Sequence, residues 1–378
     1  MSRTNAFIPR LESLRGIAAL IVAASHIVQS PTGPDTGLLT HPGADSSDGI
    51  RLISAAVVHM VDGLQAVIFF FVLSGFVLTR SLLADPRPSP SQATDFVIAR
   101  LFRLYPAVIF AVAMFALART LFGTTPVPWT VFENMALIDT SMNGVMWSLQ
   151  LELMAIPLIY ILYLLLLRRT AATTAAAIGI CLALVVMSFD PAIHKMLGGH
   201  PSLQLYYAFT FGCFCAAASG RLASRLSPTQ ANIATAIAIV LFFTARPLLG
   251  PASPWRFVVN GLSAWMLIYL VTYGPRATLL NVLDHPTAHW LGKLSFSFYL
   301  FHFLTILPVW SHPEVLVWLV DTAGVPRLLI AAVILMASTA ATLVLAYVSH
   351  TLVEIPGIRL GRHVRALFAP RIRSAEAG

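Results

Sequence analysis

Ten apolar stretches, each close to the length of a membrane-spanning helix, run through this sequence of 378 residues. A helix needs about 20 mainly apolar residues to cross the hydrocarbon core of a bilayer. The stretches lie at residues 13–32, 60–80, 104–122, 147–167, 171–189, 203–219, 229–249, 257–274, 291–310 and 329–351. Only 11% of the residues are charged, whereas soluble domains carry roughly a quarter. The sequence therefore predicts an all-α, polytopic integral membrane protein with about 10 transmembrane helices.

The placement of Lys and Arg predicts how these helices are oriented. With the N-terminus inside, the inner segments hold Arg3, Arg10, Arg15, Arg80, Arg87, Arg100, Arg103, Arg168, Arg169, Arg221, Arg225, Arg276, Lys293, Arg359, Arg362, Arg365, Arg371 and Arg373. The outer segments hold only Arg51, Arg119, Lys195, Arg246, Arg256 and Arg327. The positive-inside rule then puts both termini in the cytoplasm, and a bacterial cytoplasmic (inner) membrane is the expected location. The net charge of +8 follows from this topology and does not indicate a nucleic-acid partner.

Residues 1–25 admit a second interpretation, a cleavable signal peptide with small residues at Ala23 and Ser25. A first membrane span is favoured, because Arg15 stands where the apolar run of a signal peptide begins and apolar residues continue past the expected cut. We expect one transmembrane domain over residues 1–360 and a basic cytoplasmic tail over residues 361–378. The longest outer loop, at about residues 33–59, is expected to cap the outer face. The three cysteines fall within spans without metal-ligand spacing, so no metal is expected.

Ionisable residues inside spans are candidates for function because burying them in lipid is unfavourable. Arg15 and His26 are eleven residues apart, almost three helical turns, so they share one face of the first span and lie about 16 Å apart along its axis. The alternative is a snorkelling arginine and a hydrogen-bonded core histidine.

Depth along the helices suggests which buried groups meet. Glu152 lies about 8 Å below the outer boundary, His302 about 17 Å up the ninth span, and His26 about 20 Å up the first. We therefore expect these three side chains in one layer of the outer half of the membrane. Two imidazoles with a carboxylate are suited to general-base chemistry. A purely structural His–Glu pair is the alternative.

The inner rim carries a different set of charges. Arg100 and Arg103 are three residues apart, so they share a face if the third helix begins early. With Arg15 they can bind phosphate through charge-assisted hydrogen bonds. Ordinary positive-inside anchoring is the alternative. A cationic inner rim beside a buried base suggests a phosphorylated donor that enters from the cytosol.

Six short blocks follow one another along the sequence. They are the stretch at 11–19 with His26, the stretch at 69–76, Arg100-Leu101-Phe102-Arg103-Leu104-Tyr105-Pro106, Trp147-Ser148-Leu149 with Glu152, the stretch at 294–302, and Glu354-Ile355-Pro356. Together and in this order they resemble membrane acyltransferase family 3. The resemblance implies transfer of an acyl group, commonly acetyl, from cytosolic acyl-coenzyme A to a hydroxyl of a carbohydrate, glycolipid or polysaccharide. It makes Arg15 and His26 the essential pair. The chain is expected to be of the stand-alone type, without a fused extracytoplasmic domain.

The mechanism expected from these residues places the coenzyme A phosphates on Arg100, Arg103 and Arg15. His26 then deprotonates the acceptor hydroxyl or is itself transiently acylated, with Glu152 or His302 tuning it. Tyr299 and Ser148 are candidates to hold the thioester and its oxyanion, with capping or packing as the alternative. Glu354, with Pro356, is expected to pair with a rim arginine.

Two other interpretations remain open from the sequence. One is a transporter or flippase for a glycolipid, and the other is a membrane-bound O-acyltransferase of an unrelated fold. The sequence does not identify the acceptor, the acyl chain or the oligomeric state.

Overall fold

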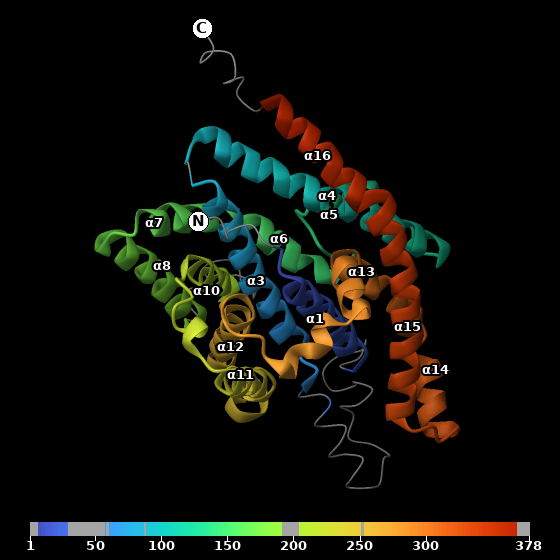
Figure 1. The fold of residues 1–378 in the computed structure, drawn as a ribbon. Helices are drawn as coiled ribbons and strands as arrows, with labels where there is room; N and C mark the ends of the chain where they lie inside the picture. Colours follow the sequence, from blue (N-terminus) through green and yellow to red (C-terminus); the bar gives the residue numbers. More distant parts are fainter. Residues whose placement is uncertain are drawn as a thin grey trace.

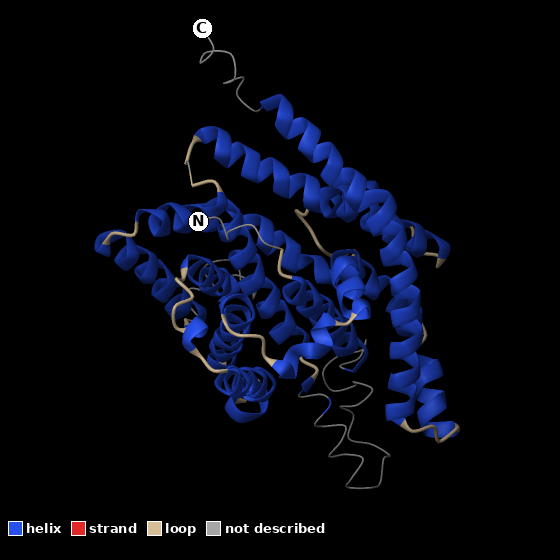
Figure 2. Ribbon diagram, in the orientation of Figure 1, coloured by secondary structure: helices blue, strands red, loops and turns tan. Residues whose placement is uncertain are grey.

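The computed structural model describes residues 7–28, 57, 60–86, 88–190, 204–250 and 253–368. Helices joined by short loops make up this part of the chain, and it contains no strand (Figure 2). The predicted outer loop at about residues 33–59 falls almost entirely outside the described residues.

Nine helical segments of the described chain are long and apolar enough to cross a membrane. They are α1 (Pro9–Val28), α3 (Gly63–Ala84), α4 (Pro90–Leu121), the combined segment η1 (Gly144–Met146), α6 (Trp147–Met154) and α7 (Ile156–Arg168), then α8 (Ala171–Phe189), α11 (Pro228–Leu249), α12 (Pro254–Tyr273), α13 (Pro286–Ser311), and α15 (Arg327–Ser349) continued by η6 (His350–Glu354) and α16 (Ile355–Phe368). The shorter elements are α5 (Pro128–Met135), α10 (Tyr206–Ala217), η3 (Ala223–Arg225), η4 (Thr278–Asp284), α14 (Pro313–Val317) and η5 (Trp318–Thr322). The chain is thus an all-α, multi-pass membrane protein.

The sixth predicted span, at residues 203–219, differs from the other nine. It forms α10, which has 12 residues. At about 1.5 Å per residue, such a helix is about 18 Å long and does not cross a core of about 30 Å by itself. Instead, α10 packs tightly on α3, because Gly75 and Gly212 leave room for the backbones to approach.

Several helices begin where the sequence offers a capping side chain. The carboxylate of Asp62 accepts a hydrogen bond from the backbone N–H of Leu64 at 3.0 Å and so caps α3. Ser89 caps α4 ahead of Pro90, whose missing N–H is no loss in the first turn. As a result α4 begins 14 residues before the predicted boundary of the third span, and Arg100 and Arg103 lie within the helix.

Helix α1 lies in the middle of the bundle, between α3 and α13 (Figure 1). Two glycines allow α1 and α13 to approach closely. A Cβ atom on Gly16 would lie 2.8 Å from the backbone nitrogen of Gly292, and one on Gly292 would lie 2.3 Å from the carbonyl oxygen of Glu12. This contact brings the helix of His26 against the helix of His302.

Helix α16 runs alongside α4 at one edge of the bundle (Figure 1). Gly361 fits against Phe102, and Arg365 forms a two-point ion pair with Asp95, at 2.5 and 2.7 Å. The helix extends across the expected domain boundary at residue 360 and ends at Phe368. Residues 369–378 of the expected tail lie outside the described chain.

Candidate active site

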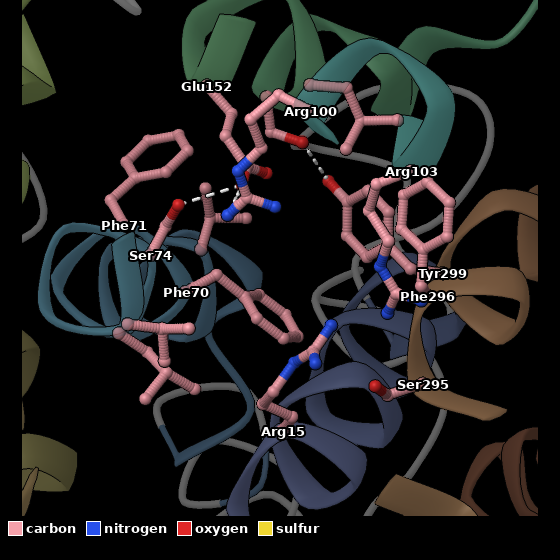
Figure 3. Close-up of a pocket in the computed structure, with 15 residues that line it drawn as sticks. Arg15, Phe70, Phe71, Ser74, Arg100, Arg103, Glu152, Ser295, Phe296 and Tyr299 are labelled. Atoms are coloured by element: carbon pink, nitrogen blue, oxygen red, sulfur yellow. Dashed lines mark hydrogen bonds and ion pairs between the residues drawn. The ribbon is translucent and has the colours of Figure 1, made fainter. Parts of the chain in front are cut away.

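A cavity of about 300 Å³ lies where α1, α3, α4, α6 and α13 meet. It is lined by Arg15, Val67, Phe70, Phe71, Leu73, Ser74, Val77, Arg100, Arg103, Ser148, Leu149, Glu152, Ser295, Phe296 and Tyr299. Figure 3 shows the three arginines reaching into this space from two helices, with aromatic rings between them. Three guanidinium groups and one carboxylate give the lining a net positive charge, which suits an anionic ligand.

Arg15 points into the cavity from α1 (Figure 3). Its guanidinium group makes no hydrogen bond or ion pair with another described residue, although Glu152 and Glu354 are close enough to act on it electrostatically. A buried charge is stable only when it is paired or solvated. Arg15 is therefore available for an anion brought by a ligand.

Arg100 lies across the cavity from Arg15 and is held by Glu152 of α6. The Nη2 atom of Arg100 is 3.7 Å from Oε1 of Glu152, and the same oxygen accepts a hydrogen bond of 2.8 Å from Ser74 Oγ. Within the described part of the chain, the Nε atom of Arg100 is buried without a hydrogen-bond partner. The same holds for the hydroxyl of Ser295, also on the cavity wall. These unused groups are ready to bind a polar ligand.

Arg103 is positioned by Glu354, which is fully buried and forms an ion pair with it. The other carboxylate oxygen, Oε2, accepts hydrogen bonds from Ser297 Oγ at 3.0 Å and from His350 Nδ1 at 3.1 Å. Glu354 ends the π-helical segment η6, just before Pro356 in the first turn of α16. Proline cannot donate a backbone hydrogen bond, and the wider π-turn accommodates that loss without breaking the long helix.

His26 and His302 lie side by side, with their ring centroids 5.4 Å apart. His302 is buried, and its Nδ1 atom is 2.7 Å from the carbonyl oxygen of Tyr299. A carbonyl oxygen only accepts, so Nδ1 carries the proton and Nε2 of the neutral ring is an acceptor. Among the described residues, that Nε2 atom of His302 has no hydrogen-bond partner. Two adjacent imidazoles can receive and return a proton.

Tyr299 connects the cavity with the histidine pair. The Tyr299 ring lines the cavity, and its centroid lies 5.6 Å from the centroid of the His302 ring. Its hydroxyl is 2.8 Å from Ser148 Oγ, and both hydroxyls are within hydrogen-bond distance of the carbonyl oxygen of Val145. Two hydroxyls have two hydrogens, and the mutual bond and the bond to Val145 use both. Neither group is a free oxyanion donor in this arrangement.

Glu152 lies beside the rim arginines. The sequence predicts it in one layer with His26 and His302, and in the structure it lines the cavity together with Arg15, Arg100 and Arg103. A count of residues along one helix gives the height of a side chain but not its lateral neighbours. Those neighbours depend on packing, which here brings Ser74 of α3 and Arg100 of α4 to Oε1 of Glu152.

The hydroxyls that hold the site together were not predicted. Ser74 fixes Glu152, Ser297 fixes Glu354, and Ser295 faces the cavity. Each is a serine among the apolar residues of its span, a pattern that also occurs at ordinary contacts between membrane helices. Their burial beside charged groups becomes visible only in three dimensions. Among the described residues, no group of three or more His, Cys, Asp or Glu is arranged to hold a metal ion.

Comparison with known families agrees with this arrangement. The family model described as an acyltransferase domain matches residues 8–351. The match runs from α1, with Arg15 and His26, to α15, so the chain belongs to this family of acyltransferases. The resemblance predicted from the sequence blocks is confirmed.

Two curated proteins are similar to the chain over long stretches. The peptidoglycan O-acetyltransferase OatA of Listeria monocytogenes is 25% identical over 302 residues, which cover 68% of this chain and 48% of OatA. The acyltransferase MdmB of Streptomyces mycarofaciens is 27% identical over 417 aligned positions, which cover 98% of this chain and 97% of MdmB. The chain thus spans about half the length of OatA and nearly the whole of MdmB. No solved structure gives a significant match.

Proposed function

We propose that this protein is a membrane O-acyltransferase that moves an acyl group, acetyl in the simplest case, from cytosolic acyl-coenzyme A to a hydroxyl of a carbohydrate, glycolipid or polysaccharide. The observation that carries the proposal is the unpaired Arg15 in a cationic cavity, on the same helix as His26. One end of α1 thus provides an anion site and the other a base. The name of OatA, which describes O-acetylation of peptidoglycan, supports a carbohydrate hydroxyl as the acceptor.

The spacing along α1 fits a donor with a long, flexible arm. Arg15 and His26 are about 16 Å apart along the helix axis, so a ligand with phosphates at Arg15 needs an arm of similar length to reach His26 with its thioester. Coenzyme A carries its thiol on such an arm. Arg100 and Arg103 add bidentate donors for the phosphates, since a guanidinium group matches phosphate geometry.

The proposed reaction uses the two imidazoles. His26 takes the proton of the acceptor hydroxyl while that oxygen attacks the thioester carbonyl carbon. A carbon–oxygen bond forms and the carbon–sulfur bond breaks. The imidazolium of His26 then returns the proton to the departing thiolate, which leaves as coenzyme A. His302 positions His26 and stabilises its cation. In the second form of the mechanism, His26 carries the acyl group transiently.

Sidedness follows from the positive-inside rule. Arg100 and Arg103 mark the cytoplasmic side, so the donor enters there and the histidine pair lies deeper in the membrane. The location proposed is the bacterial cytoplasmic membrane. This direction of entry places the charged part of the donor at the membrane surface and the thioester in an environment from which water is excluded.

The test is release of free coenzyme A from acetyl-coenzyme A by the purified full chain in liposomes, with a cell-envelope glycan extract as acceptor. His26→Ala is measured in parallel, with its folding checked by size-exclusion chromatography and circular dichroism. We expect release that depends on both the extract and His26. A folded His26→Ala protein with full activity contradicts the proposed base. Movement of labelled glycolipid across the bilayer without coenzyme A release would instead indicate a flippase.

A further inference from the structure

A second groove adjoins the cavity on the side of α16. Its volume is about 300 Å³, and it lies between α3, α4 and α16. Val77, Arg100 and Arg103 line both spaces, so the groove borders the cavity. The groove adds two further arginines, Arg362 and Arg365, both from α16.

The charges of the groove are only partly neutralised within the protein. Arg365 is held by Asp95 through two hydrogen bonds, and Arg103 by Glu354. Arg362 is exposed and makes no hydrogen bond or ion pair with the described part of the chain. The exposed positive charge of Arg362 therefore lies beside the partly buried charges of Arg100 and Arg103.

The size of the proposed donor argues for a second site. Pockets that enclose a drug-sized ligand measure roughly 300–1,000 Å³, and the cavity at Arg15 is at the lower limit of that range. An acyl-coenzyme A molecule carries, beyond its thioester and arm, a diphosphate, a phosphorylated ribose and an adenine. The cavity alone is too small for all of these. The adjoining groove offers more space and two more arginines.

We propose that the α16 groove binds the phosphate-bearing nucleotide end of the acyl-coenzyme A donor, with Arg362 in contact with a phosphate. This inference rests on the proposed function, since it assigns the far end of the same donor. Arg365 is a positioning residue, because its ion pair with Asp95 fixes α16 against α4. The close approach of Gly361 to Phe102 adds an apolar contact between α16 and α4.

The experiment measures equilibrium binding to the purified full chain in detergent and in nanodiscs, so that no acceptor is required. The probes are coenzyme A, 3′-dephospho-coenzyme A and pantetheine. The test variant is Arg362→Gln. The matched control is Arg359→Gln, which removes the same charge from an exposed arginine of the same helix that does not line the groove.

We expect Arg362→Gln to bind coenzyme A about tenfold more weakly, equivalent to about 1.4 kcal/mol, and pantetheine as the wild type does. Arg359→Gln should bind all three probes like the wild type. If Arg362→Gln binds 3′-dephospho-coenzyme A as tightly as the wild type does, Arg362 contacts the 3′-phosphate. If the variant also binds this probe more weakly, Arg362 contacts the diphosphate.

Two failures can be told apart. If the wild type does not bind coenzyme A, the proposed donor is wrong, and the groove assignment is wrong with it. If the wild type binds coenzyme A and Arg362→Gln binds it equally well, only the groove assignment is wrong. The nanodisc measurements, with phosphatidylcholine alone or with added phosphatidylglycerol, identify a competing occupant. Inhibition by phosphatidylglycerol that requires Arg362, with no effect of the variant in detergent, would assign the groove to a lipid headgroup and overturn the proposal.

Discussion

Arg15 and His26 belong to the same helix, α1, but their surroundings differ. The cavity around Arg15 is lined by charged groups, and the pair of His26 and His302 is surrounded by aromatic rings. Arg15, Arg100 and Glu152 form a charged set in which Arg15 and the Nε atom of Arg100 have no partner among the described residues. His26 and His302 instead lie among aromatic rings, and His302 is buried. A charged site recognises phosphate, whereas proton transfer is favoured by a neutral base in surroundings with little water. In the proposed function, this separation corresponds to binding at one end of α1 and chemistry at the other.

The largest expected effect comes from His26→Gln, which removes the base and keeps a polar side chain. General-base catalysis contributes about 10²–10⁴-fold, so we expect coenzyme A release to fall by at least about 100-fold. The dissociation constant for coenzyme A should stay within about twofold, a change worth less than 0.5 kcal/mol. Turnover and binding measured on one preparation test both statements. Parallel losses of turnover and of coenzyme A binding would show that the two regions are not separate.

Arg15→Gln should give the reverse pattern. Loss of a charge-assisted, bidentate contact is worth about 2 kcal/mol, so the KM for acetyl-coenzyme A should rise about thirtyfold. The rate with S-acetyl-pantetheine, which has no phosphate, should change little. Steady-state kinetics with both donors distinguish this from damage to the fold, since a misfolded enzyme loses activity with either one. An equal loss with both donors, in a variant whose folding is confirmed by size-exclusion chromatography and circular dichroism, would place Arg15 in the chemistry and remove the distinction between the two regions.

Substitutions at Arg103 and Glu354 test how much their ion pair stabilises the charged region. Glu354→Gln leaves the Arg103 guanidinium beside a neutral amide, and removing one partner of a buried ion pair destabilises the fold. Because Arg103 is 27% exposed, we expect a loss of about 2 kcal/mol, seen as a lower unfolding temperature. The double variant Arg103→Gln with Glu354→Gln should recover part of that loss. Additive losses would mean that Glu354 acts through Ser297 and His350 alone.

The sequence predicts well which arginines form the charged region. It predicts poorly which side chains from other helices contact them. The spacing of Arg100 and Arg103 puts them on one helical face, and the structure finds them with Arg15 around one cavity. Helical period is a local property, so it can be read from residue numbers. The positions of Glu152, Ser74 and Ser295 relative to the arginines depend on which helices touch. Such contacts come from tertiary packing, which residue spacing does not encode.

The smallest expected effect comes from a residue that supports α1 without belonging to either region. Asp284 accepts hydrogen bonds from Arg10 at 2.9 and 2.6 Å and from Arg276 at 2.6 Å. These hydrogen bonds, that of Arg10 foremost, hold the pKa of the Asp284 carboxyl well below its usual range. The carboxylate therefore stabilises the fold at every pH above its unfolded pKa of about 3.9, and this contribution is lost as the pH falls toward the lower folded pKa.

Asp284→Asn should accordingly lower stability by about 1 kcal/mol at pH 7, since Arg276 is exposed and adds little. The difference in unfolding temperature between wild type and variant should be constant from pH 8 to about pH 5 and should shrink below about pH 4. Thermal unfolding in detergent across this range measures it, with Asn281→Ala as a control that removes another contact of Arg10 without a titrating group. Because Arg10 lies at the start of α1, the variant should change the KM and the turnover number little and together. A change in the KM alone would show that the position of α1 affects donor binding more than chemistry. A change in the turnover number alone would show the reverse.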